Sequence, residues 1–242
     1  MVTYIYKDRN WVLYKTRNAC AQSVPRVGLF FLEFSMNTAI LIDGAFLRKK
    51  FHAAYKNNIN AENIYQFAES LLVRFNCPRD GLHRIYYYDC SPCTAKSSLP
   101  VSNHAFLFEK TPQYAYGKQL LSDIKKLDFF AVREGTLQFS GWKLRKSAYN
   151  KQQLTDDDFE PELHQKGVDI KIGLDLAWIS YNHIAERVIF VTGDSDFIPA
   201  IKTARRNGVF IYLATLHHMV RPELPDNCDV SNHDSIKSYF QM

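Results

Sequence analysis

The chain has 242 residues, enough to bury one substantial hydrophobic core, and its 46% hydrophobic and 23% charged residues are ordinary for a globular protein. No low-complexity segment is present, and no apolar run approaches the length of a membrane-spanning helix. The formal charge of +5 is weak evidence for a polyanionic partner, because residues 1–35 hold five basic residues against two acidic ones and the remainder carries only +2. Five cysteines, an odd number and widely spaced apart from Cys90 and Cys93, indicate together with the lack of a signal peptide a reducing, cytoplasmic setting.

Residues 1–35 differ from the rest of the chain. They mix aromatic and basic residues with no clear period, and Met36 stands directly before the first clean strand. We expect this N-terminal extension to be a disordered segment or the product of an upstream start, with a basic arm as the alternative. Residues 36–242 are expected to form one domain.

From residue 38 onward, buried-strand patterns alternate with helical patterns. Strands are predicted at 38–42, 84–88, 188–191 and 209–214, with further strand composition at 129–139 around a turn signal, Glu134-Gly135. Helices are predicted at 45–55, 61–75, 113–127, 166–180 and 197–206, a long loop at 90–112 and an acidic connector at 155–162. This alternation predicts an α/β fold of three layers around a mostly parallel central sheet.

Carboxylates gather at the predicted carboxyl edge of this sheet, which is where open α/β folds bind their ligands. The acidic residues that follow a strand or open a helix there are Asp43, Asp89, Asp169, Asp194 and Asp196. Like charges brought together repel one another unless a cation or protons neutralise them, so a divalent metal explains the set most simply. Mg²⁺ or Mn²⁺ held by such carboxylates supports phosphodiester hydrolysis.

Each of these residues also has a structural interpretation. Asp194 or Ser195 can cap the helix that follows, and Asp196 favours the dipole of its first turn. Asp89 has the alternative of capping the loop after it. Asp175 lies six residues from Asp169 and points to another side of the same helix, so we expect it in a supporting position or on a solvated face. Lys166 and Thr192, which flank the acidic motifs, are further site candidates.

Three motifs in this order resemble a known family. They are Ile42-Asp43-Gly44, then Lys166-Gly167-Val168-Asp169, then Thr192-Gly193-Asp194-Ser195-Asp196-Phe197 with Asn207-Gly208 beyond. Together they resemble the NYN domain of LabA-like proteins, part of the PIN-like nuclease superfamily, over residues 38–214. The resemblance implies a PIN-like Rossmannoid fold and an endoribonuclease that depends on Mg²⁺ or Mn²⁺. It places Asp43, Asp169, Asp194 and Asp196 at the family's acidic positions. The chain departs from the family pattern at Ala45, where asparagine is frequent.

A basic segment offers a place for RNA. Lys143, Arg145 and Lys146 follow Trp142, whose indole is a candidate for stacking on unpaired bases of single-stranded RNA. The alternative is a solvated hairpin with half-buried aromatic residues.

Other functions fit less well. A haloacid dehalogenase phosphatase normally has a second acid two residues after the first, where this chain has Ala45. A von Willebrand-type metal site needs spaced serines after the first strand, and residues 44–47 contain none. The main rival is a catalytically weak PIN-like module that binds RNA or a protein for regulation. The sequence is compatible with a homodimer as well as a monomer, and we expect no association with membranes.

Overall fold

A computed structural model describes residues 2–7, 10–15 and 36–240. The chain divides into two compact units at Met36/Asn37. In the first unit, the strands β1 (Val2–Lys7) and β2 (Asn10–Lys15) form an antiparallel pair, although this stretch of sequence shows no clear period. The other residues up to 35, including most of the predicted N-terminal extension, lie outside the described residues.

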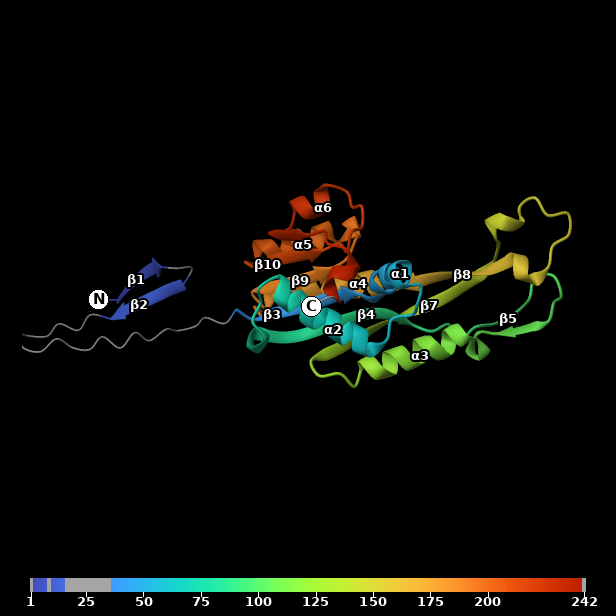
Figure 1. The fold of residues 1–242 in the computed structure, drawn as a ribbon, viewed down its shortest axis with the longest axis horizontal. Coiled ribbons are helices and arrows are strands. Elements are labelled where there is room, and N and C mark those ends of the chain that lie inside the picture. Colours follow the sequence, from blue (N-terminus) through green and yellow to red (C-terminus); the bar gives the residue numbers. More distant parts are fainter. Residues whose placement is uncertain (1, 8–9, 16–35, 241–242) are drawn as a thin grey trace, which may run out of the picture. The chain divides into compact units, whose positions relative to one another are not determined.

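The second unit is built on a seven-stranded sheet whose neighbouring strands are parallel except for β7 and β8 (Figure 1). From edge to edge its strands are β11 (Val230–Asn232), β10 (Phe210–Ala214), β9 (Arg187–Val191), β3 (Thr38–Asp43), β4 (Leu82–Ser91), β7 (Phe130–Leu144) and β8 (Phe159–Lys166). Adjacent parallel strands need crossover connections, which the helices supply. The predicted α/β fold with a mostly parallel central sheet is therefore confirmed.

Helices cover both faces of the sheet and complete the three layers. One face packs against α1 (Gly44–Tyr55), α2 (Ala61–Arg74) and α3 (Pro112–Ile124), and the other against α4 (Val168–Tyr181) and α5 (Ile198–Arg206). The central strand β3 alternates between the two cores: Ile40 and Ile42 contact the α1 side, and Ala39 and Leu41 contact the α4 side. Residues of this strand are buried on both faces, as a parallel sheet requires.

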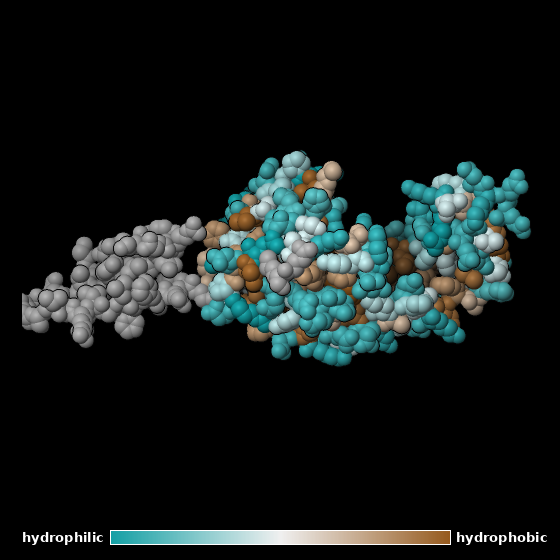
Figure 2. Space-filling model, viewed as in Figure 1, coloured by the Kyte–Doolittle hydropathy of each residue, from teal (hydrophilic) through white to brown (hydrophobic). Residues whose placement is uncertain are grey.

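Two elements extend past this body. The antiparallel ribbon of β7 and β8 runs well beyond it, and the small hairpin of β5 (Lys96–Ser98) and β6 (Ala105–Leu107) lies near the ribbon's far end (Figure 1). Figure 2 shows that the face carrying α1, α2 and α3 is mainly hydrophilic, with hydrophobic side chains in the hollow between body and ribbon. A short helix, α6 (Glu223–Asp226), precedes β11. Within the described residues, no helix is long and apolar enough to cross a membrane.

The structure corrects three predictions about local elements. Glu134-Gly135 is not a turn, because β7 is continuous through it; a Cβ on Gly135 would lie 2.6 Å from the Lys166 carbonyl oxygen, so this glycine permits close packing of the neighbouring strand. Part of the acidic connector at 155–162 is strand β8, which pairs with the basic end of β7. Strand β11 beyond residue 214 was not predicted, since its three residues give too short a pattern.

Candidate functional site

Asp43 ends the central strand of the sheet and begins the first helix. Ile42 on β3 pairs with Val191 on β9, so Asp43 lies at the same edge as the turn that carries Asp194. The Asp43 side chain caps α1 by accepting a hydrogen bond of 3.0 Å from the Phe46 amide. Gly44 allows this sharp entry, since a Cβ there would lie 2.7 Å from the Tyr88 carbonyl oxygen. The capping prediction therefore applies to Asp43 as well as to the later acids.

The turn after β9 holds two more acids in a compact local network. Thr192 is buried, and its hydroxyl accepts a hydrogen bond from the Asp194 amide at 3.1 Å. The Asp194 carboxylate in turn accepts from the Asp196 amide at 2.9 Å, which caps the short 3₁₀ turn before α5. Asp194 and Asp196 are both exposed to solvent. Thr192 thus orients the backbone of this acidic turn, which gives this further site candidate a structural role.

Asp169 reaches the same edge from α4, which packs on the face of the sheet opposite α1. Gly167 precedes α4 with a φ of +80°, a left-handed conformation that favours glycine, and Asp169 follows in the first turn of the helix. Lys166 ends strand β8 and is exposed beside this turn. The predicted delivery of Asp169 by a glycine turn is observed.

The four acids share an electrostatic environment. The pKa of Asp43 is raised from 3.8 to about 6, mainly by burial and in smaller part by the nearby carboxylates of Asp169, Asp89 and Asp194, against the lowering effect of the hydrogen bond from the Phe46 amide. Burial followed by the charges of Asp194 and Asp196 also raises the pKa of Asp169. Negative charge is therefore concentrated at this edge, where Asp43 is the least solvated acid.

The predicted shared metal cluster is not formed in this conformation. Within the described residues, no group of three or more histidine, cysteine, aspartate or glutamate side chains is arranged to hold a metal ion. Asp43 and Asp194 each direct one oxygen at a backbone amide of the helix or turn that follows. Asp43, Asp169 and Asp194 share an edge of the sheet, but in this conformation they are not arranged as a ready three-ligand site.

A cleft of about 420 Å³ opens beside these acids. Asp43 and the turn at 193–196 line one part of it, and the loop after β10 lines the rest with His218, Met219, Val220 and Arg221. The ring of Phe46 packs edge-on against His218 with centroids 5.6 Å apart. Both rings lie close over Gly193, where a Cβ would meet His218 at 2.4 Å.

Positive charge borders the same cleft. Burial and then the neighbouring Lys50 and Lys49 lower the pKa of His218, which shows that these three groups lie near one another. The Lys50 ammonium group also lies 5.7 Å from the centroid of the Phe46 ring. The sequence motifs do not include Phe46, His218 or Arg221. The signal was the position of His217 and His218 just past a buried strand, at the edge where the acids gather.

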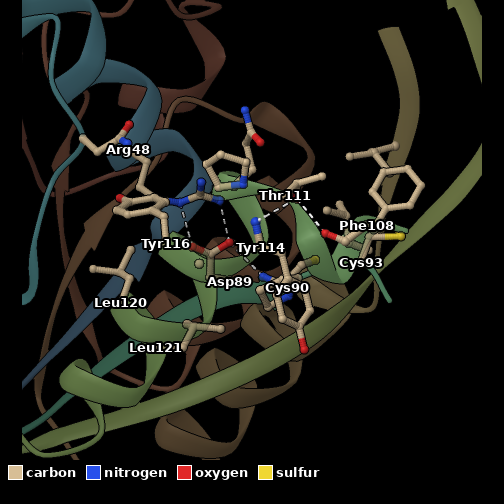
Figure 3. A pocket seen from close by; sticks show the side chains of 17 residues that line it. Arg48, Asp89, Cys90, Cys93, Phe108, Thr111, Tyr114, Tyr116, Leu120 and Leu121 are labelled. Atoms are coloured by element: carbon tan, nitrogen blue, oxygen red, sulfur yellow. Dashed lines mark hydrogen bonds and ion pairs between the residues drawn. The ribbon is translucent and has the colours of Figure 1, made fainter. Parts of the chain in front are cut away.

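Asp89 belongs to a different site. Strand β4 continues to Ser91, so Asp89 lies inside the strand, where it is buried and forms a bidentate ion pair with Arg48 of α1, with both contacts at 2.8 Å. Figure 3 shows this pair beside Tyr116 at one side of a second cavity, of about 340 Å³, which Phe108 and Leu121 also line. The Asp89 carboxylate also accepts a hydrogen bond of 2.8 Å from the Cys90 amide. Because Arg48 already neutralises it, Asp89 is a structural anion.

Asp175 is also separate from the cleft. It accepts hydrogen bonds of 3.0 Å from the Tyr88 hydroxyl and from Arg133. These contacts bind α4 to strands β4 and β7 on the inner part of the sheet. This agrees with the expectation that Asp169, and not Asp175, faces the acidic cluster.

The basic segment lies at the far end of the β7–β8 ribbon. The Trp142 indole donates a hydrogen bond of 2.8 Å to the Ser98 carbonyl and packs among Phe106, Phe108 and Phe139, so it holds the β5–β6 hairpin to the ribbon. Arg145 lies 3.6 Å from Glu160 on the paired strand, while Lys143 and Lys146 are exposed. The acidic strand β8 therefore offsets part of the charge that the sequence suggested for RNA.

The chain is similar to the following two known proteins, among others. A stretch of 55 residues is 31% identical to an uncharacterized protein, MJ0482, of Methanocaldococcus jannaschii; it covers 23% of this chain and spans 23% of that relative. A crystal structure of VPA0982, a protein of unknown function from Vibrio parahaemolyticus, aligns over 86% of this chain and 96% of its own, with 16% identity and a TM-score of 0.46.

The family assignment rests on a family model. The model of the NYN domain matches residues 37–235, which include the whole sheet and all three acidic motifs. The fold that carries it is the PIN-like arrangement of a mostly parallel sheet between two helical layers. The chain therefore belongs to the NYN domain family.

Proposed function

We propose that this chain is a LabA-like NYN protein that hydrolyses RNA phosphodiester bonds as a Mg²⁺- or Mn²⁺-dependent endoribonuclease. One observation carries the proposal: Asp43 is largely buried at the carboxyl edge of the sheet, and this burial, together with the charges of the carboxylates near it, raises its pKa to about 6. A carboxylate set that opposes its own ionisation is well suited to a cation.

The donor chemistry fits a hard divalent cation. Mg²⁺ prefers oxygen ligands and commonly uses only one or two carboxylates, with waters and substrate phosphate completing its coordination. Asp43, Asp169, Asp194 and Asp196 would hold it, and when bound it would supply charge stabilisation and a more acidic water. The residues themselves also prepare the site: Thr192 orients the Asp194 turn, and Gly167 places Asp169 at the edge.

The residues around the cleft suit an RNA strand. Lys49, Lys50 and Arg221 supply positive charge for phosphates, and the Phe46 and His218 rings line the wall where an unpaired base would lie. Lys143, Arg145, Lys146 and Trp142 on the ribbon are the sequence-derived candidates for a more distant contact. Of these, exposed Lys143 and Lys146 are the most available.

A second function has an observation in its favour. Asp43 and Asp194 both cap backbone amides, and no ready group of three ligands exists within the described residues. A catalytically weak module that binds RNA or a protein would retain this arrangement for its stability. The two functions predict different behaviour of the same RNA.

The test is cleavage of labelled single-stranded RNA by the purified full chain with Mn²⁺, Mg²⁺ or a chelator. We expect cleavage with metal and its loss in Asp194→Asn, whose side-chain oxygen still accepts from the Asp196 amide. RNA affinity should hold or rise slightly, because a negative charge near phosphate is removed. Equal cleavage by the variant would assign the activity to a contaminant. Binding without cleavage by the wild type would favour the regulatory module.

Lys143 and Lys146 are expected to contribute to RNA binding through charge. Replacing both with alanine should weaken binding and reduce the slope of log affinity against log salt by about 1.4, at about 0.7 per phosphate contact on a single strand. The matched control replaces exposed Lys202 and Arg206 of α5, near the opposite edge of the sheet. An equal change in the control would show a general charge effect and no ribbon contact.

A further inference from the structure

The outward face of α4 is apolar along its whole length. Ile170, Leu174, Trp178 and Tyr181 recur at intervals of four, four and three residues and so share one side of the helix. Within the part of the chain that the structure describes, each is between 61% and 69% exposed. These are large hydrophobic side chains, and they are aligned on one surface.

Two small residues continue the same surface. Gly173 and Ala177 are one turn apart and lie beside the four large side chains on the helix. A Cβ on Gly173 would meet no atom within 4 Å, so packing within the described chain does not require a glycine there. Glycine weakens a helix interior, and a position open to solvent gains nothing from it unless another backbone approaches closely.

The inward face of α4 is also apolar. Val168, Ile172, Leu176 and Ile179 are buried against the sheet. A helix that is hydrophobic all round is normally buried on all sides. The four exposed side chains present on the order of 500 Å² of apolar surface, as much as the largest apolar patch of a typical monomer, which is often an interaction site.

We propose that this face of α4 pairs with the same face of a second copy of the chain, with the two helices antiparallel about a two-fold axis. The axis crosses the helix between the levels of Asp175 and Leu176. Gly173 of one copy then lies level with Trp178 of the other, Leu174 with Ala177, and Ile170 with Tyr181. The inference does not depend on the proposed nuclease function.

The pattern of sizes selects a second copy as the partner. At the two levels next to the axis a large side chain from one copy shares the space with glycine or alanine from the other. A parallel pair would instead bring Trp178 to Trp178 and Leu174 to Leu174. Two-fold interfaces are self-complementary in this way. Each copy would contribute on the order of 500 Å² from these side chains and more from flanking residues, near the roughly 800 Å² of a standard interface.

The pairing leaves both clefts accessible. Asp169 lies at the N-terminal end of α4, so antiparallel helices place the two copies of it at opposite ends of the contact. The 14 residues of α4 span about 21 Å. No residue of α4 lines the cleft beside Asp43, so each cleft is made by one chain, and a variant that separates the copies should retain its metal and RNA binding.

The first experiment measures the mass of the full chain by light scattering over a dilution series. We expect a species of twice 28.1 kDa, which Leu174→Glu and Trp178→Glu reduce to the monomer by weakening association about thirtyfold or more. Val73→Glu is the matched control, because Val73 is 69% exposed on α2 and should leave the dimer intact. A wild-type monomer, or a dimer that both α4 variants leave unchanged, would overturn the proposal.

A second experiment tests the register. Ile170→Cys and Tyr181→Cys combined in one chain are about 16 Å apart along the helix and cannot bridge internally. Across the two-fold axis they face each other, so oxidation should give a covalent dimer that neither single variant gives. A bridge from α4 to the chain's own residues 16–35 in a monomer would assign the surface to that segment and contradict the pairing.

Discussion

Replacing Arg48 with methionine is expected to lower the free energy of unfolding by about 3 kcal/mol, because it leaves a buried carboxylate without its counter-charge. The Asp89 side chain is 3% exposed, and Arg48 supplies both of its ion-pair contacts at 2.8 Å. The Tyr87 hydroxyl at 3.4 Å and the Cys90 amide cannot replace a full positive charge. Urea denaturation at neutral pH would measure the loss.

The control for this variant is an exposed pair of similar chemistry. Arg145 and Glu160 are each about half exposed and 3.6 Å apart, so Arg145→Met should cost less than about 1 kcal/mol. In the double variant Arg48→Met/Asp89→Leu, part of the stability should return, because no charge remains buried. If Arg48→Met costs no more than Arg145→Met, then water reaches Asp89 and the pair is not a structural lock.

The sheet and its acidic edge were predictable because they depend on local patterns. Strands such as 38–43 and 187–191 are short runs of buried β-branched residues, and parallel strands end at a common edge. The glycine turn at Gly167 has a chemical signature that one sequence displays. Asp43, Asp169 and Asp194 could therefore be placed at one edge before the fold was known.

The predictions that the structure corrected concern residues whose roles depend on contacts between distant segments of the chain. The residues near Asp89 in the sequence do not predict a contact with Arg48, which lies 41 residues away. Because of that contact, Asp89 is part of an ion pair and not a candidate metal ligand. The role of Gly135 comes from the backbone of Lys166 pressed against it. The sequence suggests that the Trp142 indole is free to stack on a base, but its N–H group donates a hydrogen bond to the Ser98 carbonyl of the β5–β6 hairpin. A local sequence pattern does not identify a contact partner that is distant in the sequence.

The sequence is compatible with both helix capping and metal binding by Asp194, and the structure shows why the same position suits both roles. The carboxyl edge of a parallel sheet is also where helices begin, so an acid there meets free backbone amides. Asp43 and Asp194 each direct one oxygen at such an amide. A carboxylate has a second oxygen, so the cap fixes the side chain without removing its capacity to bind a cation.

Asp43→Asn is expected to make the metal-free protein more stable at pH 8 by up to about 3 kcal/mol, while RNA cleavage falls about a hundredfold or more. Below pH 3.8 the acid is protonated in both the folded and unfolded states and contributes nothing. Between pH 3.8 and about 6 the unfolded state ionises first, so the wild type loses stability as pH rises, and the full penalty remains above pH 6. Asparagine removes the ionisation and still accepts from the Phe46 amide.

Melting temperatures of both proteins at pH 4 and pH 8, in chelator, measure this difference. The gain from Asp43→Asn should be small at pH 4 and maximal at pH 8. The matched control is Asp80→Asn, because Asp80 is an exposed acid that lies just before the start of strand β4, at the other edge of the sheet. Adding Mg²⁺ at pH 8 should then stabilise the wild type more than the variant, because a bound cation offsets the repulsion that asparagine has already removed. A gain that is equal at both pH values would mean that Asp43 ionises as freely in the folded chain as in the unfolded one. The acidic edge would then lose the electrostatic argument for a metal.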